Sequence, residues 1–429
     1  MSKKNFNFKN SIFFYKIPFI LTILIPPFLI TGPFLSDLAL SICSLIFIIN
    51  IVKLKNYAYV KNIYSYIFLF FILLIIISSF LSDDIIYSSK SSIFYIRFYF
   101  FSLSTWYLVN TNSKIINYIF ISILVSFAGL ILDGFTQFFL KKNIIGLPLI
   151  KTRVSSFFGD ELILGSYLSR LFPILFAGMI FRYEKYKKKD FMFYLVIFIF
   201  ILSEVLIFLS GERIAFFYLN LSTVFILFLS VDYKKIRLFT LSFSLILIVI
   251  ISNFSPQFKE RMVDKTIEQI GIKSDRQHIF SSQHNDHYIS ALKMFKKNIF
   301  FGIGPKMFRH KCSDPQYIFS KNSCSTHPHN TYLQLLSETG LFTFLIFFSI
   351  FCYFMFKSTE HCYLKIFKKK KIFSDFQVAL LSSILITLWP IAPTGNFFNN
   401  WMSIVYFYPV GIFLSTLKNK NNSLKSYKF

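Results

Sequence analysis

Long apolar stretches alternate with short polar segments along most of the chain. A helix rises 1.5 Å per residue, so about 20 apolar residues cross a hydrocarbon core of about 30 Å. The pattern predicts twelve transmembrane helices, over residues 12–30, 34–52, 63–81, 92–109, 115–134, 162–181, 191–209, 214–231, 238–252, 331–356, 372–390 and 401–417. The expected fold class is therefore an all-α polytopic membrane protein.

Composition and loop charge support this interpretation. Apolar residues make up 55% and charged residues 15% of the 429 positions, which excludes a disordered chain and disfavours a soluble multidomain enzyme. A net charge of +26 would suggest nucleic acid in a soluble protein. Here the basic residues concentrate in alternate short loops, such as 182–189, 234–237 and 365–371, which predicts that these loops and both termini are cytoplasmic. The first apolar stretch lacks a small-residue cleavage site and should remain as an anchor.

One connection is long and lies on the outer side, so three regions are expected: residues 1–252 with about nine spans, a large loop over 253–330, and residues 331–429 with about three spans. Long loops in compact proteins are usually functional. Two amphipathic helices are expected in this loop, with apolar positions at Phe258, Met262, Val263, Ile267 and Ile270, and at Tyr288, Leu292, Phe295 and Ile299. We expect these faces to pack on each other or on the bundle; the alternative is insertion into the membrane.

The large loop also contains Cys312 and Cys324. An oxidising outer compartment favours a disulfide between them, and two free thiols are the alternative.

Six of the seven histidines fall in the large loop, which marks it as the expected seat of proton-transfer chemistry. The densest group, His327 and His329, directly precedes the tenth span. A helix starting near Asn330 would direct unpaired N–H groups outward, a favourable site for phosphate. Asn330, Gln334 and Glu338 then share one face, directed to the bundle interior or to a watery cavity. For Gln334 and Glu338 the alternative is polar contact between helices without chemistry.

Two further segments place cations near the outer membrane boundary. Glu212 and Arg213 lie in a tight turn between the seventh and eighth spans, which favours an anion contact over an arginine that only reaches toward the interface. Arg153 lies in an outer loop, and Arg170 lies about two turns inside the sixth span, where it needs a counter-charge or a bound anion. Asp133, Glu204 and Arg97 are other buried candidates, for which structural pairing is expected.

Two other interpretations are disfavoured. Residues 302–305 are glycine-rich but follow no strand and precede no Lys-Ser or Lys-Thr, so we expect a turn rather than a phosphate loop. The histidines and loop cysteines could form a zinc site, but their spacing matches no standard pattern, and we expect no metal.

Together these features resemble the O-antigen ligase and O-antigen polymerase family of bacterial envelope glycosyltransferases. Residues 327–334 and 338–341 are similar to the family's His-x-His-Asn-x-Tyr-Leu stretch and the Glu-x-Gly-Leu that follows it. Residues 210–215 resemble its Ser-Gly-x-Arg-x-Ala turn, and residues 302–308 its Gly-x-Gly-Pro-x-x-Phe segment. The order of these motifs and the topology strengthen the likeness.

The resemblance implies a metal-independent enzyme without a cofactor, in the inner membrane. It would move a glycan from undecaprenyl pyrophosphate to a hydroxyl of lipid A-core, or of a growing glycan, on the periplasmic face. His329 would be the general base, with His327 as second choice, and Arg213 would neutralise the pyrophosphate. Arg153 and Arg170 would hold phosphates, and Glu338 or Glu212 would orient a histidine or an arginine.

One departure concerns an arginine that family members often carry in the large loop. The nearest position here holds His284 or His287, and Arg276 and Arg261 lie further back. Besides polymerisation, the alternatives include a transporter or lipid-glycan flippase, although no internal repeat is apparent. Expected partners are the lipid-linked donor, the acceptor and membrane lipid, and no nucleic acid.

Overall fold

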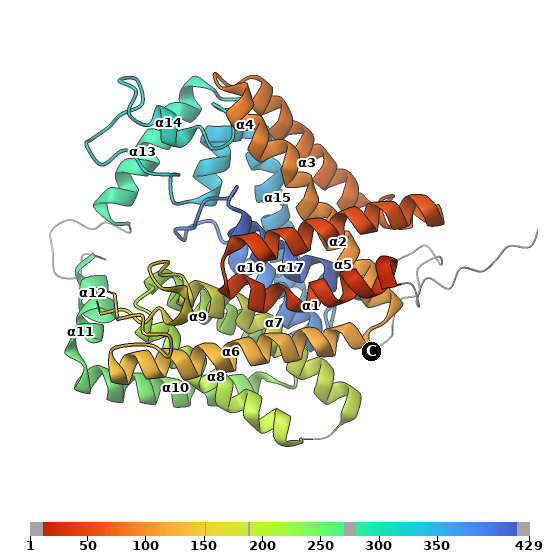
Figure 1. Ribbon diagram of the computed structural model, residues 1–429, viewed down its shortest axis with the longest axis vertical. Coiled ribbons are helices and arrows are strands. Elements are labelled where there is room, and N and C mark those ends of the chain that lie inside the picture. The colour runs from red at the N-terminus through yellow and green to blue at the C-terminus, as the bar shows by residue number, and fades with distance from the viewer. Residues whose placement is uncertain (1–11, 151, 188, 270–279, 418–429) are drawn as a thin grey trace, which may run out of the picture.

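The computed structural model describes residues 12–150, 152–187, 189–269 and 280–417, and within these it is helical, with isolated β-bridges and no named strand (Figure 1). A helix lies on each of the twelve predicted spans. These are α1 (Ile17–Ile30), α2 (Pro33–Leu54), α3 (Ile63–Phe80), α5 (Ile96–Thr111), α6 (Lys114–Leu140), α7 (Leu164–Tyr186), α8 (Phe191–Leu209), α9 (Arg213–Leu229), α10 (Lys234–Phe254), α15 (Thr331–Lys368), α16 (Asp375–Thr387) and α17 (Asn400–Thr416). The all-α class is confirmed.

Seven of the described helices are long and apolar enough to cross a membrane, namely α2, α3, α6, α7, α8, α10 and α15. The chain is therefore a multi-pass membrane protein. The other five apolar runs form helices that fall short by length or composition, so the count of twelve spans stays a prediction. Helix α15 continues to Lys368, about three turns beyond its predicted end.

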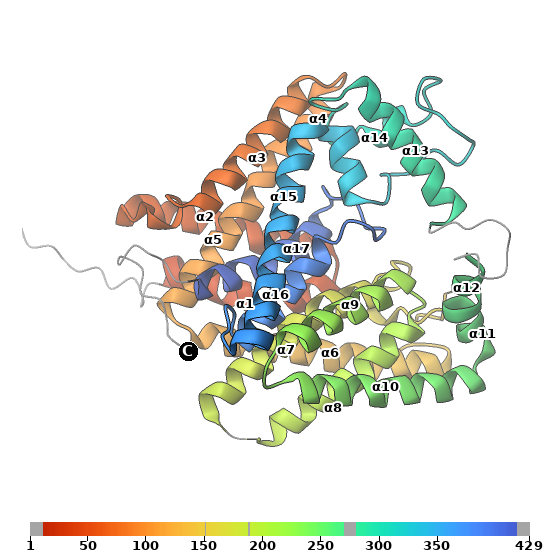
Figure 2. The same cartoon turned by 180° about the vertical axis from the view of Figure 1, so that it is seen from behind.

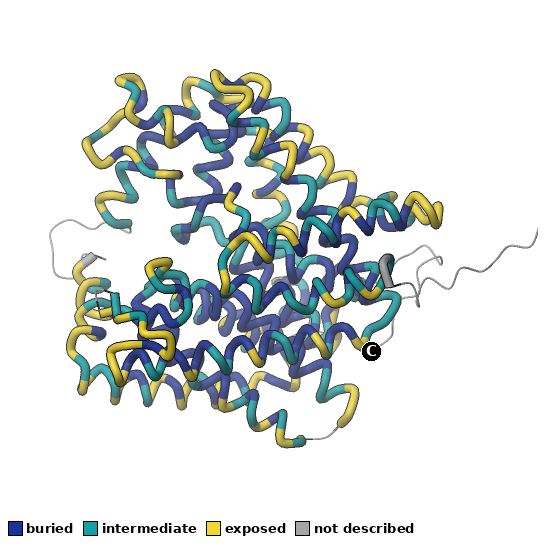
Figure 3. Tube along the Cα trace, in the orientation of Figure 1, coloured by how far each residue is buried: buried dark blue, intermediate teal, exposed yellow. Residues whose placement is uncertain are grey.

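Helix α7 is enclosed by its neighbours, since 94% of its most apolar 18-residue stretch is buried. Buried positions, dark blue in Figure 3, gather in the interior of the bundle. Glycine permits this close packing, because a Cβ on Gly178 would lie 2.7 Å from the Phe120 ring of α6. The hydroxyl of Tyr167 donates to the carbonyl of Pro26 in α1 at 2.9 Å, and Ser383 of α16 donates to the carbonyl of Arg170 at 3.3 Å. The regions before and after the large loop thus share one core.

One prediction about loop charge is wrong. Arg237 was expected among the basic residues of a cytoplasmic loop, but it is fully buried and pairs with Glu204 of α8. The expectation of structural pairing is confirmed for Glu204, for Arg97, which pairs with Asp37 at 2.9 Å, and for Asp133, which accepts hydrogen bonds from Asn143 and Ser156.

The large loop contains both expected amphipathic segments. The first runs through α11 (Pro256–Lys259), a π-helical turn (Glu260–Asp264) and α12 (Lys265–Gln269), and buries Phe258 against Phe138 of α6. It packs on the bundle, as expected; Ile270 lies outside the described residues. The second is α13 (Ser282–Lys297), which lies beside α15 in both views (Figure 2).

The apolar face of α13 differs from the prediction. Leu292 and Ile299 are 39% and 44% exposed, whereas Ala291 and Met294 are buried with Tyr288. Met294 packs with Met307 and Phe308, which come from the turn before α14 (Phe308–Lys311) and from α14 itself. The partner of α13 is thus a chain segment that follows it in sequence, and this partner determines which face is covered.

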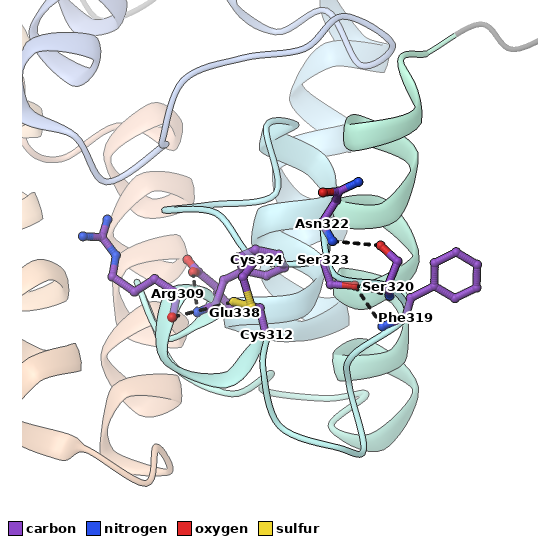
Figure 4. Close-up of a disulfide and its surroundings, with 9 residues drawn as sticks. Arg309, Cys312, Phe319, Ser320, Asn322, Ser323, Cys324 and Glu338 are labelled. Atoms are coloured by element: carbon purple, nitrogen blue, oxygen red, sulfur yellow. Dashed lines mark hydrogen bonds between the residues drawn. A yellow bond between two sulfur atoms is a disulfide. The ribbon is translucent and has the colours of Figure 1, made fainter.

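Cys312 and Cys324 form a disulfide with their Cα atoms 5.1 Å apart (Figure 4). Cys312 is buried in the same cluster as Met294 and Phe308. The disulfide therefore ties the segment that leads into α15 to the packed part of the large loop.

Candidate functional site

A break in α15 organises the site. Gly340 interrupts the helix with φ of 79°, in the left-handed region. Gly302, with φ of 66°, lies against this break, and a Cβ on it would be 2.6 Å from the Thr339 backbone nitrogen. The N–H groups of Ile303 and Gly304 donate to carbonyls of α15 at 3.0 and 2.8 Å. The glycine-rich segment is thus a docked turn, as predicted, and both motifs belong to one structural unit.

Glu338 holds this unit together from inside. It is fully buried, and its carboxylate accepts from the N–H groups of Lys306 at 3.0 Å and Phe308 at 3.1 Å, and from Gln334 Nε2 at 2.9 Å. Gln334 also donates to Asn396 Oδ1 at 3.0 Å and accepts from the N–H of Phe397 at 2.9 Å. The polar stripe faces the bundle interior, and its contacts favour the structural alternative for both residues.

Asn330 caps α15, where a helix start was expected. Its Oδ1 accepts from the N–H groups of Tyr332 and Leu333, both at 3.0 Å. The expectation of unpaired N–H groups available to phosphate is therefore wrong, because the cap side chain already satisfies two of them. The Asn330 amide donates to the carbonyl of Pro390 at 2.8 Å, which joins α15 to the loop between α16 and α17.

Thr394, in that loop, fixes both histidines of the His-x-His motif. Its N–H donates to the carbonyl of His329 at 2.9 Å, and its carbonyl lies 3.1 Å from His327 Nε2. A carbonyl only accepts, so His327 carries a proton on Nε2, and its Nδ1 accepts from the Thr326 hydroxyl at 2.9 Å. Both nitrogens of His327 are thus engaged.

His329 is less constrained at its ring. Its backbone is left-handed, with φ of 56°, a strained conformation for a residue with a side chain. Nε2 lies 2.9 Å from the Ser325 hydroxyl, and no described residue hydrogen-bonds Nδ1. One ring nitrogen of His329 is therefore without a protein hydrogen-bond partner among the described residues.

Four histidines from two segments converge here. The ring centroid of His329 lies 4.1 Å from that of His327 and 5.3 Å from those of His284 and His287, which come from α13. Sequence placed the pairs about 40 residues apart, and the contact between α13 and α15 brings them together. His329 occupies the centre of this histidine cluster.

The surroundings of the histidine cluster lower the pKa of each of its four imidazoles. Burial, followed by the neighbouring histidines, lowers the pKa of His329 to about 3. Burial lowers the pKa of His327 to about 4 and also lowers the pKa values of His284 and His287. Arg213 contributes to the shift at His284, so this arginine of α9 and the histidine cluster influence one another electrostatically.

The turn at Gly211 gathers three arginines. Arg153 Nε donates to the carbonyl of Ser210 at 2.8 Å, and Arg261 Nε donates to that of Gly211 at 2.9 Å. A Cβ on Gly211 would lie 2.7 Å from Arg261 Nε and 3.0 Å from Arg153 Cγ, so only glycine allows both side chains to flank the turn. Arg213 begins α9 two residues later. We call Arg153, Arg213 and Arg261 the arginine turn.

The Glu212 carboxylate makes its hydrogen bonds with the start of α7. Its carboxylate accepts from the N–H groups of Gly165 and Ser166 at 2.6 and 3.1 Å, and from the Ser166 hydroxyl at 2.6 Å. It thereby caps the start of α7 and fixes the turn. Burial raises its pKa, against the opposing effects of Ser166 and Arg153.

Arg170 is 3% exposed inside the bundle. Its guanidinium lies over the rings of Tyr218 at 4.5 Å and Tyr406 at 5.7 Å, and its Nε and Nη1 have no hydrogen-bond partner among the described residues. The ring faces stabilise its charge. Within the same residues, no group of three His, Cys, Asp or Glu is arranged to hold a metal ion.

Residues 165–348 match the family model described as O-Antigen ligase. Over this segment the chain is similar to the O-antigen ligase family. The family comprises ligases and polymerases of O-antigen, which are glycosyltransferase-like enzymes acting on lipid-linked glycans. No curated protein matched the chain.

The O-antigen ligase segment extends from the start of α7 to the middle of α15, and so includes the histidine cluster, Arg213 and Arg261. Two site residues escaped the sequence analysis. Thr394 lies outside this segment, and it belongs to none of the sequence motifs described above. Arg261 was noted only as a distant alternative to the family's large-loop arginine, and its contact with Gly211 bridges 50 positions.

Proposed function

We propose that the protein transfers a glycan from undecaprenyl pyrophosphate to a hydroxyl of lipid A-core, on the periplasmic face of the inner membrane with both termini in the cytoplasm. The histidine cluster, with Arg213 near enough to act electrostatically on His284, carries this proposal. It unites a group that accepts a proton at neutral pH with cations that stabilise a leaving pyrophosphate. The match of residues 165–348 to the O-antigen ligase family model supports the same chemistry.

His329 acts as the general base. It takes the proton of the acceptor hydroxyl while the oxygen attacks the anomeric carbon, and the bond from that carbon to the pyrophosphate breaks. His329 suits this role better than His327, because both nitrogens of His327 have protein partners. The low pKa of His329 keeps it unprotonated before the donor binds, and the negative donor then raises that pKa toward the range useful for catalysis.

Arg213 and Arg153 neutralise the leaving pyrophosphate, and Arg261 supplies the third cation. Arg153 and Arg261 use Nε for backbone carbonyls, which fixes each side chain while its charge is retained. Fixed guanidinium groups replace a divalent metal in this scheme. His284 and His287 contact the substrate at the edge of the cluster. Arg170, enclosed by aromatic rings, plays a secondary part.

Replacing His329 tests the assignment. In proteoliposomes supplied with a lipid-linked glycan and lipid A-core, H329A should lower transfer by about 10²–10⁴-fold, the usual contribution of a general base. The matched control is H310A, since His310 is exposed and packs edge-to-face with Tyr87 and not with the rings of the cluster. Full activity of a folded H329A protein would disprove the role of His329.

The acceptor separates ligase from polymerase, which is the alternative within the family. Deleting the gene should remove all long-chain lipopolysaccharide while undecaprenyl-linked polymer persists. Lipopolysaccharide capped with a single repeat unit would instead identify a polymerase.

A further inference from the structure

A second cationic site lies apart from the arginine turn. An open cavity of about 410 Å³ is bounded by residues from α2, from α4 (Ile85–Ser92), from the start of α5, from the turn after Gly304 and from the start of α17. Its charged lining residues are Asp37, Lys90, Arg97 and Lys306. None of the residues assigned above to the base or to the arginine turn lines it.

The charges in this cavity do not balance. Asp37 is the one carboxylate among the lining residues, and Arg97 engages it through Nη2 at 2.9 Å and Nε at 3.0 Å. Asn400 of α17 donates to its other oxygen at 3.1 Å. No described carboxylate lies within 4 Å of Lys90 or Lys306. Two ammonium groups thus face the cavity without an ion pair among the described residues, and the carboxylate that acts on Lys306 from farther away is that of Glu338.

The position of Lys306 is fixed by its backbone. Its φ is 63°, in the left-handed region, and its N–H donates to Glu338 at 3.0 Å. The preceding Gly304 packs against Ser82, where a Cβ would collide. Burial, and then Arg309, lowers the pKa of Lys306, as expected for a crowded cation. A bound anion would offset the unfavourable burial of this positive charge.

The cavity connects to the histidine cluster through a few hydrogen bonds. Glu338 holds both the Lys306 backbone and Gln334, and Gln334 binds Asn396, two residues beyond Thr394. Thr394 in turn holds His327 and His329. The arginine turn is built from α9 and the segments before α7 and after α10, whereas α2, α4, α5 and α17 form the cavity walls. Two cationic sites of separate construction are therefore each linked to the histidine cluster, the cavity through these hydrogen bonds and the arginine turn through the effect of Arg213 on His284.

We propose that this cavity binds a phosphomonoester carried by the acceptor lipid, with Lys90 and Lys306 as its counter-charges. A phosphomonoester carries a charge of about −1.5 to −2 near neutral pH, which matches two ammonium groups. Lysine binds phosphate as a compact point charge. The inference rests on the proposed function, because that function requires two lipid substrates to meet at His329, and the arginine turn already takes the donor's pyrophosphate.

Lipid binding tests the site without requiring catalysis. Phosphatidic acid and diacylglycerol with the same acyl chains serve as probes for the full-length protein in detergent, measured by native mass spectrometry. The variant K90Q/K306Q should bind phosphatidic acid about tenfold more weakly than wild type does. Diacylglycerol lacks the phosphate and should bind to wild type and to every variant with the same affinity. The control K142Q/K321Q removes two exposed lysines outside the cavity and should bind as wild type does. Equal binding by both double variants would overturn the proposal.

Transfer kinetics identify which substrate carries the phosphate. K90Q/K306Q should raise KM about tenfold for a phosphorylated acceptor, and leave KM unchanged for its dephosphorylated form and for the donor. A rise confined to the donor would assign the cavity to pyrophosphate and overturn the assignment to the acceptor. If the wild-type protein transfers no glycan, the proposed function fails, and the binding comparison still decides whether the cavity is a phosphate site.

Discussion

Arg237 lies in the first turn of α10 and Arg261 lies just past its end, yet the two meet different surroundings. Arg237 is fully buried; its guanidinium binds Glu204, Thr223 and Thr240, and Ser244 donates to the same carboxylate. Arg261 is half-buried, donates to one backbone carbonyl, and has no described carboxylate within 4 Å. The charge of Arg237 is compensated by a carboxylate inside the protein, whereas the charge of Arg261 has no such partner among the described residues.

The difference follows from where each charge lies. A charge in the apolar bundle is costly unless a partner and hydrogen bonds compensate it, and a compensated charge cannot attract a substrate. At the arginine turn, backbone carbonyls fix the guanidinium groups without cancelling them, and Glu212 is directed at the start of α7. The first arrangement serves the fold, and the second suits an anion that arrives from outside.

The largest expected effect is on stability, from removing one partner of the buried pair. E204A leaves Arg237 charged and unpaired, which should lower the free energy of unfolding by about 3–5 kcal/mol. Replacing both residues, as E204L/R237M, should recover most of this loss, because no uncompensated charge remains. Thermal unfolding in detergent measures both, and transfer per folded molecule should be unchanged in the double variant. An E204A protein as stable as wild type would show that the pair does not serve the fold.

Variants of the arginine turn should show the reverse behaviour, with transfer activity lost and stability largely kept. R261A and R153A should each lower transfer by about 10²–10³-fold, the size typical of losing one group that stabilises a transition state, or about 2.7–4 kcal/mol. Their melting temperatures should change less than that of E204A, because Arg261 loses one bond to a backbone carbonyl and Arg153 loses two, and neither leaves a buried charge unpaired. The control is K259A, an exposed cation two residues before Arg261. If R261A melts far below wild type while its folded fraction transfers normally, Arg261 resembles Arg237 after all.

The same contrast explains what sequence could predict. Apolar runs located the helices, and Asn330 marked the start of α15, because both signals are local. The burial of Arg237 was missed, since a cation one turn inside a helix looks like part of the adjacent basic loop. Glu338 was expected to orient a histidine or an arginine, because a stripe at i, i+4 and i+8 shows only which way a carboxylate points. Its actual partners, Lys306 and Phe308, come from a distant turn.

Convergence of the site was equally hidden. The meeting of His284 with His329 depends on packing between α13 and the turn before α14, and on a disulfide that places the chain before Ser325. Arg261 reaches Gly211 through a helix whose sequence shows only amphipathic spacing. Motifs identified the residue types of the site, whereas long-range contacts determined which of them meet.

The smallest expected effect concerns pH. His327 and His329 have lowered pKa values in the folded protein, about 4 and 3, against an ordinary value of about 6.5. Between pH 6.5 and 4 the unfolded chain therefore binds more protons than the folded one, and stability must fall as pH falls. At pH 5 the buried His327 alone should contribute a loss of about 1–2 kcal/mol relative to pH 7.5. Melting temperatures at the two pH values measure the loss, which should shrink in H327Q and persist in E204L/R237M, where the histidines are intact. An unchanged pH dependence in H327Q would mean that this histidine is not held neutral by its surroundings, and the same surroundings would then give no reason for His329 to be a free base at neutral pH.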